Sequence, residues 1–142
     1  MMTTTSTNWK FDDSDLTELP KEYYGFVYRI IDKITNREYL GKKFFYSSKT
    51  RQVKGKKKKV KVESDWKDYY GSNEELLKSV AENGKDKFER HIIKLCKTKG
   101  ECTYYESKYQ FQEDVLLHPE KYYNAWIMCK VHRKHLKLTD AG

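Results

Sequence analysis

The stretch YGFVYRIIDKITNREYLG, residues 24–41, carries the clearest secondary-structure signal in the chain. Its first part, Tyr24 to Ile31, is rich in β-branched and aromatic residues, which is typical of a buried strand. Asp32 to Asn36 has the composition of a turn, and Arg37 to Gly41 reads as a returning strand. The stretch therefore predicts a β-hairpin.

Directly downstream, the sequence predicts a second, strongly basic hairpin. Between Thr50 and Val62, valines alternate with lysines at a period of two, and Gly55 marks the tip. Concentrated lysines in one short element favour contact with phosphates, and the alternative is a solvated loop or a localisation signal. The residues that we expect to bind DNA here are Lys54, Lys56, Lys57, Lys58, Lys59 and Lys61.

Two capping boxes predict helices. Ser72 to Glu75 begins a helix that runs to about Glu82 and stops at Gly84, with Leu76, Leu77 and Val80 facing inward. Thr98 to Glu101 begins the longest helix, which runs to Leu117 before Pro119. Phe88 to Cys96 lies between the helices and reads as a third strand.

This order of elements predicts the fold class. We expect an α+β domain with a small, mostly antiparallel three-stranded sheet flanked by helices and an inserted basic β-hairpin. The chain has 142 residues, which suits one compact domain. The predicted divisions are a flexible N-terminal arm (1–20), the domain itself (21–129) with its basic insertion (43–66), and a basic C-terminal tail (130–142).

Composition bounds the partners and the compartment. Lys and Arg number 29 against 21 Asp and Glu, giving a formal net charge of +8, which favours a polyanionic partner over a merely solvated basic surface. Three cysteines without a C-x-x-C pair indicate a reducing compartment, and neither a signal peptide nor a membrane span is evident, so we expect a cytoplasmic protein. Cys129, His132 and His135 could begin a zinc site, but a basic tail is the favoured interpretation.

Glu106 stands out on the long helix. Cys102, Tyr105, Tyr109, Gln112 and Leu116 repeat at the period of a core-facing stripe, and Glu106 lies at its edge. A carboxylate half withdrawn from water needs a partner, either a basic side chain or a metal ion. From this helix alone, a salt bridge to a lysine is the better interpretation.

The first hairpin adds a motif. Phe26-Val27-Tyr28 followed by Tyr39-Leu40-Gly41 resembles the pair of tripeptides that names the GIY-YIG nucleases. The family continues with a polar-capped helix, a strand, a helix bearing one glutamate, and an asparagine. In this chain the helix begins at Ser72, the strand is Phe88 to Leu95, the glutamate is Glu106 and the asparagine is Asn124. The stretch YYGSN at 69–73 is also similar to phage-encoded Seg-type homing endonucleases.

The resemblance implies a metal-dependent DNA endonuclease. It implies that Glu106 holds one Mg²⁺ ion, for which Mn²⁺ can substitute, and that Tyr28, with Tyr39 beside it, acts as general base or orients the attacking water. Such a base would need its pKa lowered by nearby lysines and the metal. Asn124 would brace the site by hydrogen bonds.

Two departures from the family pattern affect the predicted site. Family members often have a histidine near the position that Tyr70 occupies here. They also often have an arginine in the helix after the second strand, which this chain lacks, so Lys67 is the first candidate for the electrostatic role of that arginine and Lys42 the second. The expected partner is DNA, with neither a membrane nor a small-molecule substrate. The alternatives are a non-catalytic basic module that binds DNA or RNA, and a structural interaction protein.

Overall fold

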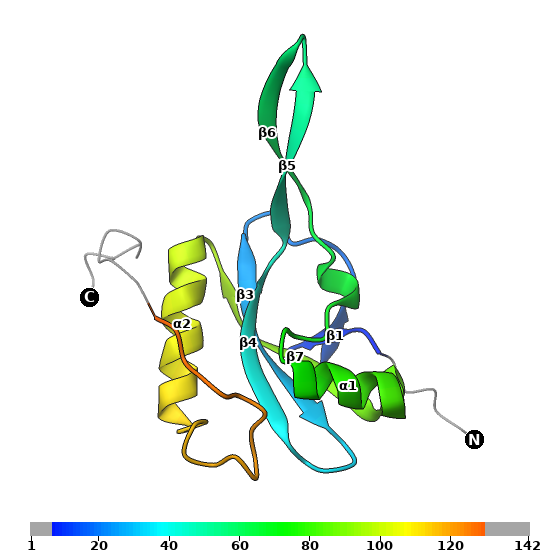
Figure 1. The fold of residues 1–142 in the computed structure, drawn as a ribbon, viewed down its shortest axis with the longest axis vertical. Helices are drawn as coiled ribbons and strands as arrows, with labels where there is room; N and C mark the ends of the chain where they lie inside the picture. Colours follow the sequence, from blue (N-terminus) through cyan, green and yellow to red (C-terminus); the bar gives the residue numbers. More distant parts are fainter. Residues whose placement is uncertain (1–6, 130–142) are drawn as a thin grey trace.

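The computed structural model describes residues 7–129 and has the predicted α+β architecture (Figure 1). Five strands form one sheet in the order β2-β1-β7-β3-β4, and β5 and β6 form a separate two-stranded sheet. In the described part of the chain, each helix is too short or too polar to cross a membrane. The elements are β1 Trp9–Phe11, β2 Ser14–Leu16, β3 Gly25–Asp32, β4 Glu38–Phe44, β5 Tyr46–Val53, β6 Lys56–Glu63, α1 Glu74–Asn83, β7 Phe88–Cys96 and α2 Lys99–Gln112, with short 3-10 turns η1 Trp66–Asp68 and η2 Lys85–Lys87.

The predicted central hairpin is formed by β3 and β4, which pair antiparallel with Tyr28 opposite Gly41. The Asp32 carboxylate stabilises the turn between them by accepting a hydrogen bond from the Ile34 backbone N–H at 2.9 Å. Asn36 ends the turn at a φ of 63°, a left-handed conformation that asparagine tolerates. The hairpin is therefore fixed by contacts between near neighbours in sequence.

The sheet is larger than the predicted three antiparallel strands. β7 pairs antiparallel with β3, as expected, but β1 runs parallel to β7 and β2 runs antiparallel to β1, so the sheet is mixed. The prediction of a flexible arm over residues 1–20 is thus wrong for residues 9–16. Trp9 is buried and donates its indole N–H to the Trp66 carbonyl at 2.6 Å, so one aromatic residue anchors a segment that lacks any periodicity.

The two faces of the sheet bury different sets of residues. Phe26, Tyr28 and Ile30 of β3 pack with α1 and η1 on one face, where they form the larger core. Val27 faces the other way and packs beneath α2 with Cys96 and Cys102. The sheet therefore lies between α1 on one side and α2 on the other (Figure 1).

Helix α1 begins one residue later than the predicted cap. Asn73, not Ser72, is its N-cap, and the Asn73 side-chain oxygen accepts the Leu76 backbone N–H at 2.9 Å. Leu76 and Val80 are buried as predicted, but Leu77 is exposed. Moving the cap to Asn73 leaves Ser72 free to face a pocket described below.

Helix α2 begins at the predicted cap, where Thr98 accepts the Glu101 backbone N–H, but it ends at Gln112 rather than Leu117. Its most buried residues are Cys102, Ser107 and Gln110, while Gln112 and Leu116 of the predicted stripe are exposed. The prediction missed two polar residues whose burial is stabilised by hydrogen bonds. Ser107 donates to the Met128 carbonyl and Gln110 to the Leu40 carbonyl.

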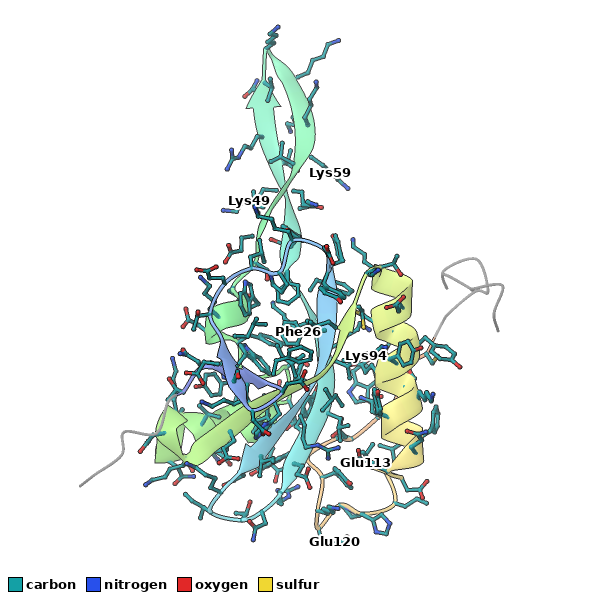
Figure 2. The ribbon with its side chains drawn as sticks, turned by 180° about the vertical axis from the view of Figure 1, so that it is seen from behind. Phe26, Lys49, Lys59, Lys94, Glu113 and Glu120 are labelled. Atoms are coloured by element: carbon teal, nitrogen blue, oxygen red, sulfur yellow. The ribbon has the colours of Figure 1, made fainter. Side chains whose placement is uncertain are left out.

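We call β5 and β6, residues 46–63, the basic ribbon. It projects from the domain as a long two-stranded hairpin whose tip is the predicted Lys54-Gly55 turn (Figures 1 and 2). The register puts Lys57, Lys59 and Lys61 on one face, opposite Gln52, Thr50 and Ser48. The predicted basic tail at 130–142, with His132 and His135, lies outside the described residues.

Candidate active site

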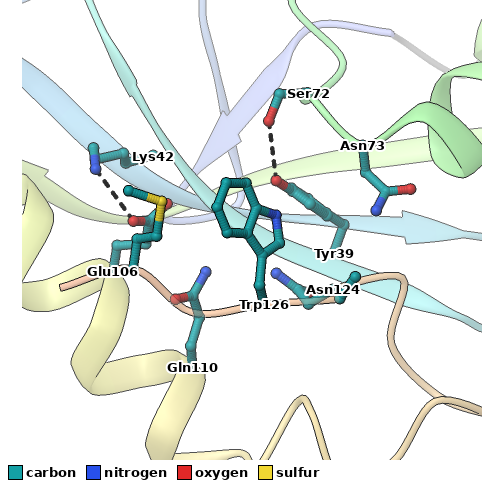
Figure 3. Close-up of a pocket in the computed structure, with 10 residues that line it drawn as sticks. Tyr39, Lys42, Ser72, Asn73, Glu106, Gln110, Asn124 and Trp126 are labelled. Carbon is teal, nitrogen blue, oxygen red and sulfur yellow. Dashed lines mark hydrogen bonds and ion pairs between the residues drawn. The ribbon is translucent and has the colours of Figure 1, made fainter.

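A pocket of about 350 Å³ opens between β4, the start of α1, the middle of α2 and the segment that follows α2 (Figure 3). Its walls combine one carboxylate, one lysine, one tyrosine and several amide and hydroxyl groups, with an indole at the rim. The lining residues are Tyr39, Lys42, Ser72, Asn73, Glu106, Gln110, Asn124, Ala125, Trp126 and Met128.

Glu106 and Lys42 form an ion pair in this pocket. The Lys42 Nζ lies 3.3 Å from a Glu106 carboxylate oxygen, and the Glu106 side chain is only 15% exposed. Burial raises the pKa of the Glu106 carboxyl above its ordinary value, and Lys42 partly opposes that shift. The carboxylate is therefore poorly solvated, and the positive charge beside it compensates only in part.

Of the two motif tyrosines, Tyr39 lines the pocket, where its hydroxyl lies 3.2 Å from the Ser72 Oγ. Tyr28 lies behind it, 1% exposed, with the two ring centroids 6.1 Å apart. Burial raises the pKa of both hydroxyls, that of Tyr28 well above its ordinary value. Both tyrosines are therefore neutral at neutral pH in the free protein. The direction of these shifts is opposite to the lowered pKa that a general base would need.

Gly41 makes room for the Tyr28 side chain. A Cβ added at Gly41 would lie 2.5 Å from the Tyr28 hydroxyl oxygen, whereas one at Gly71 would lie 3.5 Å from it, at ordinary contact distance. The residues after these glycines, Lys42 and Ser72, both line the pocket. The glycine that ends the Tyr-Leu-Gly motif therefore lets the Tyr28 ring pack directly against the backbone behind the site.

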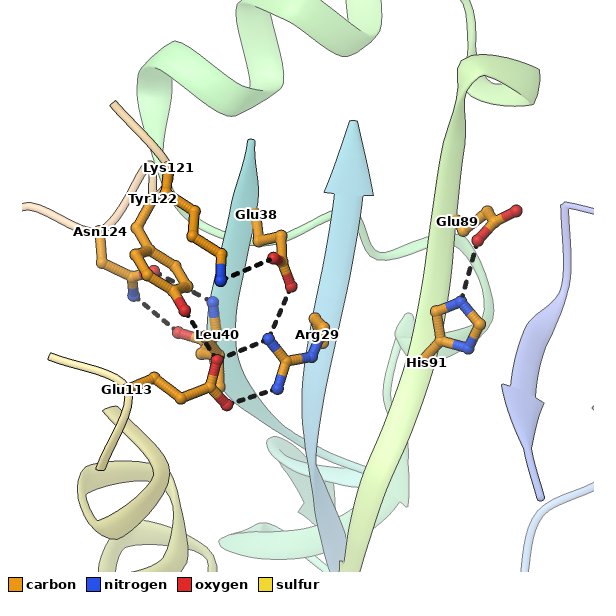
Figure 4. A network of polar contacts seen from close by, with 9 residues as sticks. All are labelled: Arg29, Glu38, Leu40, Glu89, His91, Glu113, Lys121, Tyr122 and Asn124. Atoms are coloured by element: carbon orange, nitrogen blue, oxygen red, sulfur yellow. Dashed lines mark hydrogen bonds and ion pairs between the residues drawn. The ribbon is translucent and has the colours of Figure 1, made fainter. Parts of the chain in front are cut away.

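Asn124 joins the segment after α2 to β4. Its Oδ1 accepts the Leu40 N–H at 3.1 Å and its Nδ2 donates to the Leu40 carbonyl at 2.7 Å, as one strand pairs with another (Figure 4). Gln110 Nε2 donates to the same carbonyl at 2.9 Å. Because a carbonyl can only accept, this bond fixes the orientation of the Gln110 amide. Among residues 7–129 its Oε1 is then buried without a hydrogen-bond partner.

A charged network holds the same segment from the other side (Figure 4). Arg29 of β3 binds Glu38 of β4 at 2.6 Å and forms a two-pronged contact with Glu113 at the end of α2. The Tyr122 hydroxyl donates to Glu113 at 2.8 Å. The Arg29 guanidinium holds the pKa of the Glu113 carboxyl below its ordinary value, so the network stays charged and fixes residue 122, two positions before Asn124.

The structure does not bring Lys67 and Tyr70 to this pocket. Both line a second pocket of about 310 Å³ beside β1, where Tyr70 stacks on the buried guanidinium of Arg90 at 4.2 Å. Gly71 explains the separation, because its φ of 91° turns the chain so that Ser72 lines the first pocket. Of the two candidates for the phosphate-binding cation, only Lys42 lies beside Glu106.

Sequence reasoning missed Ser72, Asn73, Gln110 and Trp126 as pocket residues. Gln110 follows Glu106 by four positions, so a shared helix face was the available signal. Ser72 and Asn73 belong to the YYGSN stretch described above, whereas no signal in the sequence marked Trp126. The lysines of the basic ribbon stand away from the pocket and are exposed.

The donor groups present fit a hard divalent cation. Within the described residues, no cluster of three or more His, Cys, Asp or Glu side chains could hold a metal, so an ion would rely on one carboxylate. Glu106 supplies that carboxylate, whereas the Oε1 of Gln110 on the same pocket wall is buried. Mg²⁺ prefers oxygen ligands and retains several waters, so one carboxylate can suffice.

Comparison with known proteins identifies the family of this domain. A family model described as "Putative endonuclease segE, GIY-YIG domain" matches residues 9–127, from β1 through the segment that carries Asn124. The chain belongs to this family of GIY-YIG domains. Neither the search of curated proteins nor the search of solved structures gave a match.

Proposed function

We propose that this protein is a DNA endonuclease that hydrolyses phosphodiester bonds with one Mg²⁺ ion, replaceable by Mn²⁺, held at Glu106. Membership in an endonuclease domain family supports nuclease activity in general. The observation that carries the finer proposal is the convergence of Glu106, Lys42 and Tyr39 in one pocket. A homing-type role in a phage is part of the same proposal and rests on the resemblance of the stretch at 69–73 to Seg-type homing endonucleases.

The chain's own residues would divide the work as follows. The ion, when bound, supplies Lewis-acid polarisation of the phosphate and stabilises the leaving oxygen. Lys42 places a positive charge beside the phosphate that enters the pocket. The Tyr39 hydroxyl, neutral and oriented by Ser72, positions the attacking water by a hydrogen bond. Tyr28 supports the Tyr39 ring from behind, and Asn124 fixes the wall opposite.

The basic ribbon would hold the DNA outside the pocket. A two-stranded β-ribbon has the width to enter the major groove of B-DNA. Its exposed lysines would neutralise phosphates on either side of that groove. Lys61 packs over the Tyr46 ring at 4.1 Å, so it belongs to the base of the ribbon rather than to its tip.

The competing proposal is a non-catalytic basic module that binds DNA or RNA. The projecting ribbon favours it, since phosphate binding there requires nothing from the pocket (Figure 2). In that case the Glu106–Lys42 pair is a structural salt bridge. This alternative predicts nucleic-acid binding without cleavage.

Incubation with supercoiled plasmid, with and without Mg²⁺, separates the two proposals. We expect nicking or linearisation only with the metal, and loss of cleavage in Glu106→Gln with DNA binding retained, because the ion acts in the transition state. Glu120→Gln is the matched control, since that side chain is 72% exposed and outside the pocket. Wild-type cleavage by Glu106→Gln would reject the metal assignment, and binding without cleavage by the wild type would favour the alternative.

A further inference from the structure

The three tryptophans of this chain lie in different surroundings. Trp9 and Trp66 are fully buried, whereas Trp126 is 69% exposed at the rim of the pocket that contains Glu106. Single exposed apolar residues are common on protein surfaces and need no explanation by themselves. The features that distinguish Trp126 are its position on the pocket and the way its segment is held.

The segment that carries Trp126 is anchored on both sides. Before it, the Tyr123 N–H donates to the Glu38 carbonyl at 2.8 Å, and Asn124 pairs with Leu40. After it, the Met128 carbonyl accepts the Ser107 hydroxyl at 3.1 Å. Residues 125–127 therefore bridge two fixed points, and the backbone that carries the exposed indole is held in place.

The neighbouring side chain, Ile127, points inward. It packs against the cluster of Leu40, Val115 and Tyr122 beneath α2. Trp126 instead lines the pocket, and in the view of Figure 3 its indole is seen between the Lys42–Glu106 pair and the Tyr39–Ser72 pair. A flat, polarisable ring thus stands beside the proposed site of phosphate hydrolysis.

We propose that Trp126 stacks on a nucleobase next to the scissile phosphate. Stacking on aromatic side chains binds an unstacked base without reading its sequence, because every base has a π-face. The cation beside the pocket, Lys42, suits the adjoining phosphate. This inference rests on the proposed function, because it places DNA in the same pocket.

A stacking contact of this kind also defines a substrate class. Bases in an intact duplex hide their faces in the helical stack, so the indole can reach one only where a base is unpaired, flipped or at an end. We therefore expect preferred binding to DNA with a local distortion. Such binding should exceed binding to a uniform duplex of the same sequence.

Binding without divalent metal tests this directly. The probes are a short duplex with one unpaired adenine and the fully paired duplex of otherwise identical sequence. Trp126→Ala should weaken binding to the first probe by about 5- to 150-fold, the range for losing one stacked base, and change binding to the second by less than about twofold. Trp126→Phe should retain most of the affinity. Phe111→Ala is the matched control, because Phe111 is an exposed aromatic residue that does not line the pocket.

Intrinsic fluorescence gives an independent readout. Wild-type emission should be quenched by the unpaired-base duplex, and the quenching should vanish in Trp126→Phe, which keeps only the two buried tryptophans. Equal affinity of wild type and Trp126→Ala for both probes, or unquenched emission in the bound complex, overturns the inference. Metal-dependent, Glu106-dependent plasmid cleavage would then leave the proposed function standing, whereas failure of the wild type to bind either duplex overturns both.

Discussion

Replacing Gly41 by alanine should force the Tyr28 ring out of its place. An added Cβ would lie 2.5 Å from the Tyr28 hydroxyl oxygen and 2.7 Å from its Cζ, while ordinary contact begins near 3.4 Å. The ring has little room to retreat, because Trp9, Tyr39 and Tyr69 surround it at centroid distances of 5.2, 6.1 and 5.9 Å.

The expected destabilisation follows from this crowding. Overpacking a well-packed core costs about 1–3 kcal/mol, and we expect the upper end because Tyr28 is enclosed. For a domain of this size, about 3 kcal/mol corresponds to a fall in Tm of roughly 10 °C. Cleavage should fall as well, since Tyr28 supports Tyr39 at the pocket.

Thermal and urea unfolding measure the loss, and a double-mutant cycle assigns its cause. Tyr28→Phe removes the closest atom, so the double variant Tyr28→Phe/Gly41→Ala should lose less stability than the sum of the single variants. Gly55→Asn is the control, because among the described residues nothing lies within 4 Å of an added Cβ there and asparagine tolerates its φ of 78°. Wild-type stability of Gly41→Ala, or strict additivity in the cycle, would refute the reasoning.

Three further predictions concern the site and the ribbon. Tyr39→Phe and Tyr28→Phe should each lower the single-turnover cleavage rate, Tyr39→Phe by roughly a hundredfold, the scale for misplacing a reacting group by about 1 Å; unchanged rates would make both rings core residues. The raised pKa of Glu106 means that the folded state binds the carboxyl proton more tightly than the unfolded state does. The stability that this proton contributes is therefore fully present below about pH 4 and is lost as the pH rises through the folded-state pKa. Without divalent metal, Glu106→Gln should therefore melt above the wild type at neutral pH, with the difference shrinking at acid pH; a wild type as stable as the variant at neutral pH would contradict this. The last change replaces four ribbon lysines with glutamine, namely Lys56, Lys57, Lys58 and Lys59. The slope of log affinity against log salt should then become shallower by about 0.9 per lost phosphate contact. An unchanged slope would show that these lysines do not contact DNA.

The sequence by itself determined the elements whose signals are local. The β3–β4 hairpin could be located because Asp32 and Asn36 fix its turn through neighbours a few residues away. The ribbon tip at Gly55 and the Thr98 cap of α2 have the same local origin. Hydrogen bonds of this kind form between residues close in the chain, so residue type and spacing suffice to predict them.

Candidate site residues could be proposed from the sequence mainly through a motif, although Glu106 also stands out from the pattern of its helix. The resemblance to GIY-YIG nucleases implies Tyr39, Lys42, Glu106 and Asn124, and the structure places all four in one pocket. It also implies Tyr28, Lys67 and Tyr70, which do not line that pocket. Gln110, which sits one turn after Glu106, was missed because a polar residue on an inward face gives no hydrophobic signal. Its burial depends on the Leu40 carbonyl, 70 positions earlier in the chain.

Tertiary structure decided the features that depend on distant partners. β1 exists as a sheet strand because Lys10 pairs with His91 and the Trp9 indole binds the Trp66 carbonyl. Tyr70 lies away from the pocket because it stacks on Arg90, a residue of β7. Such contacts are stable only once the sheet has assembled, because the chain-closure entropy of long loops must be offset by many contacts formed together. Composition and periodicity report on near neighbours and therefore carried no signal for them.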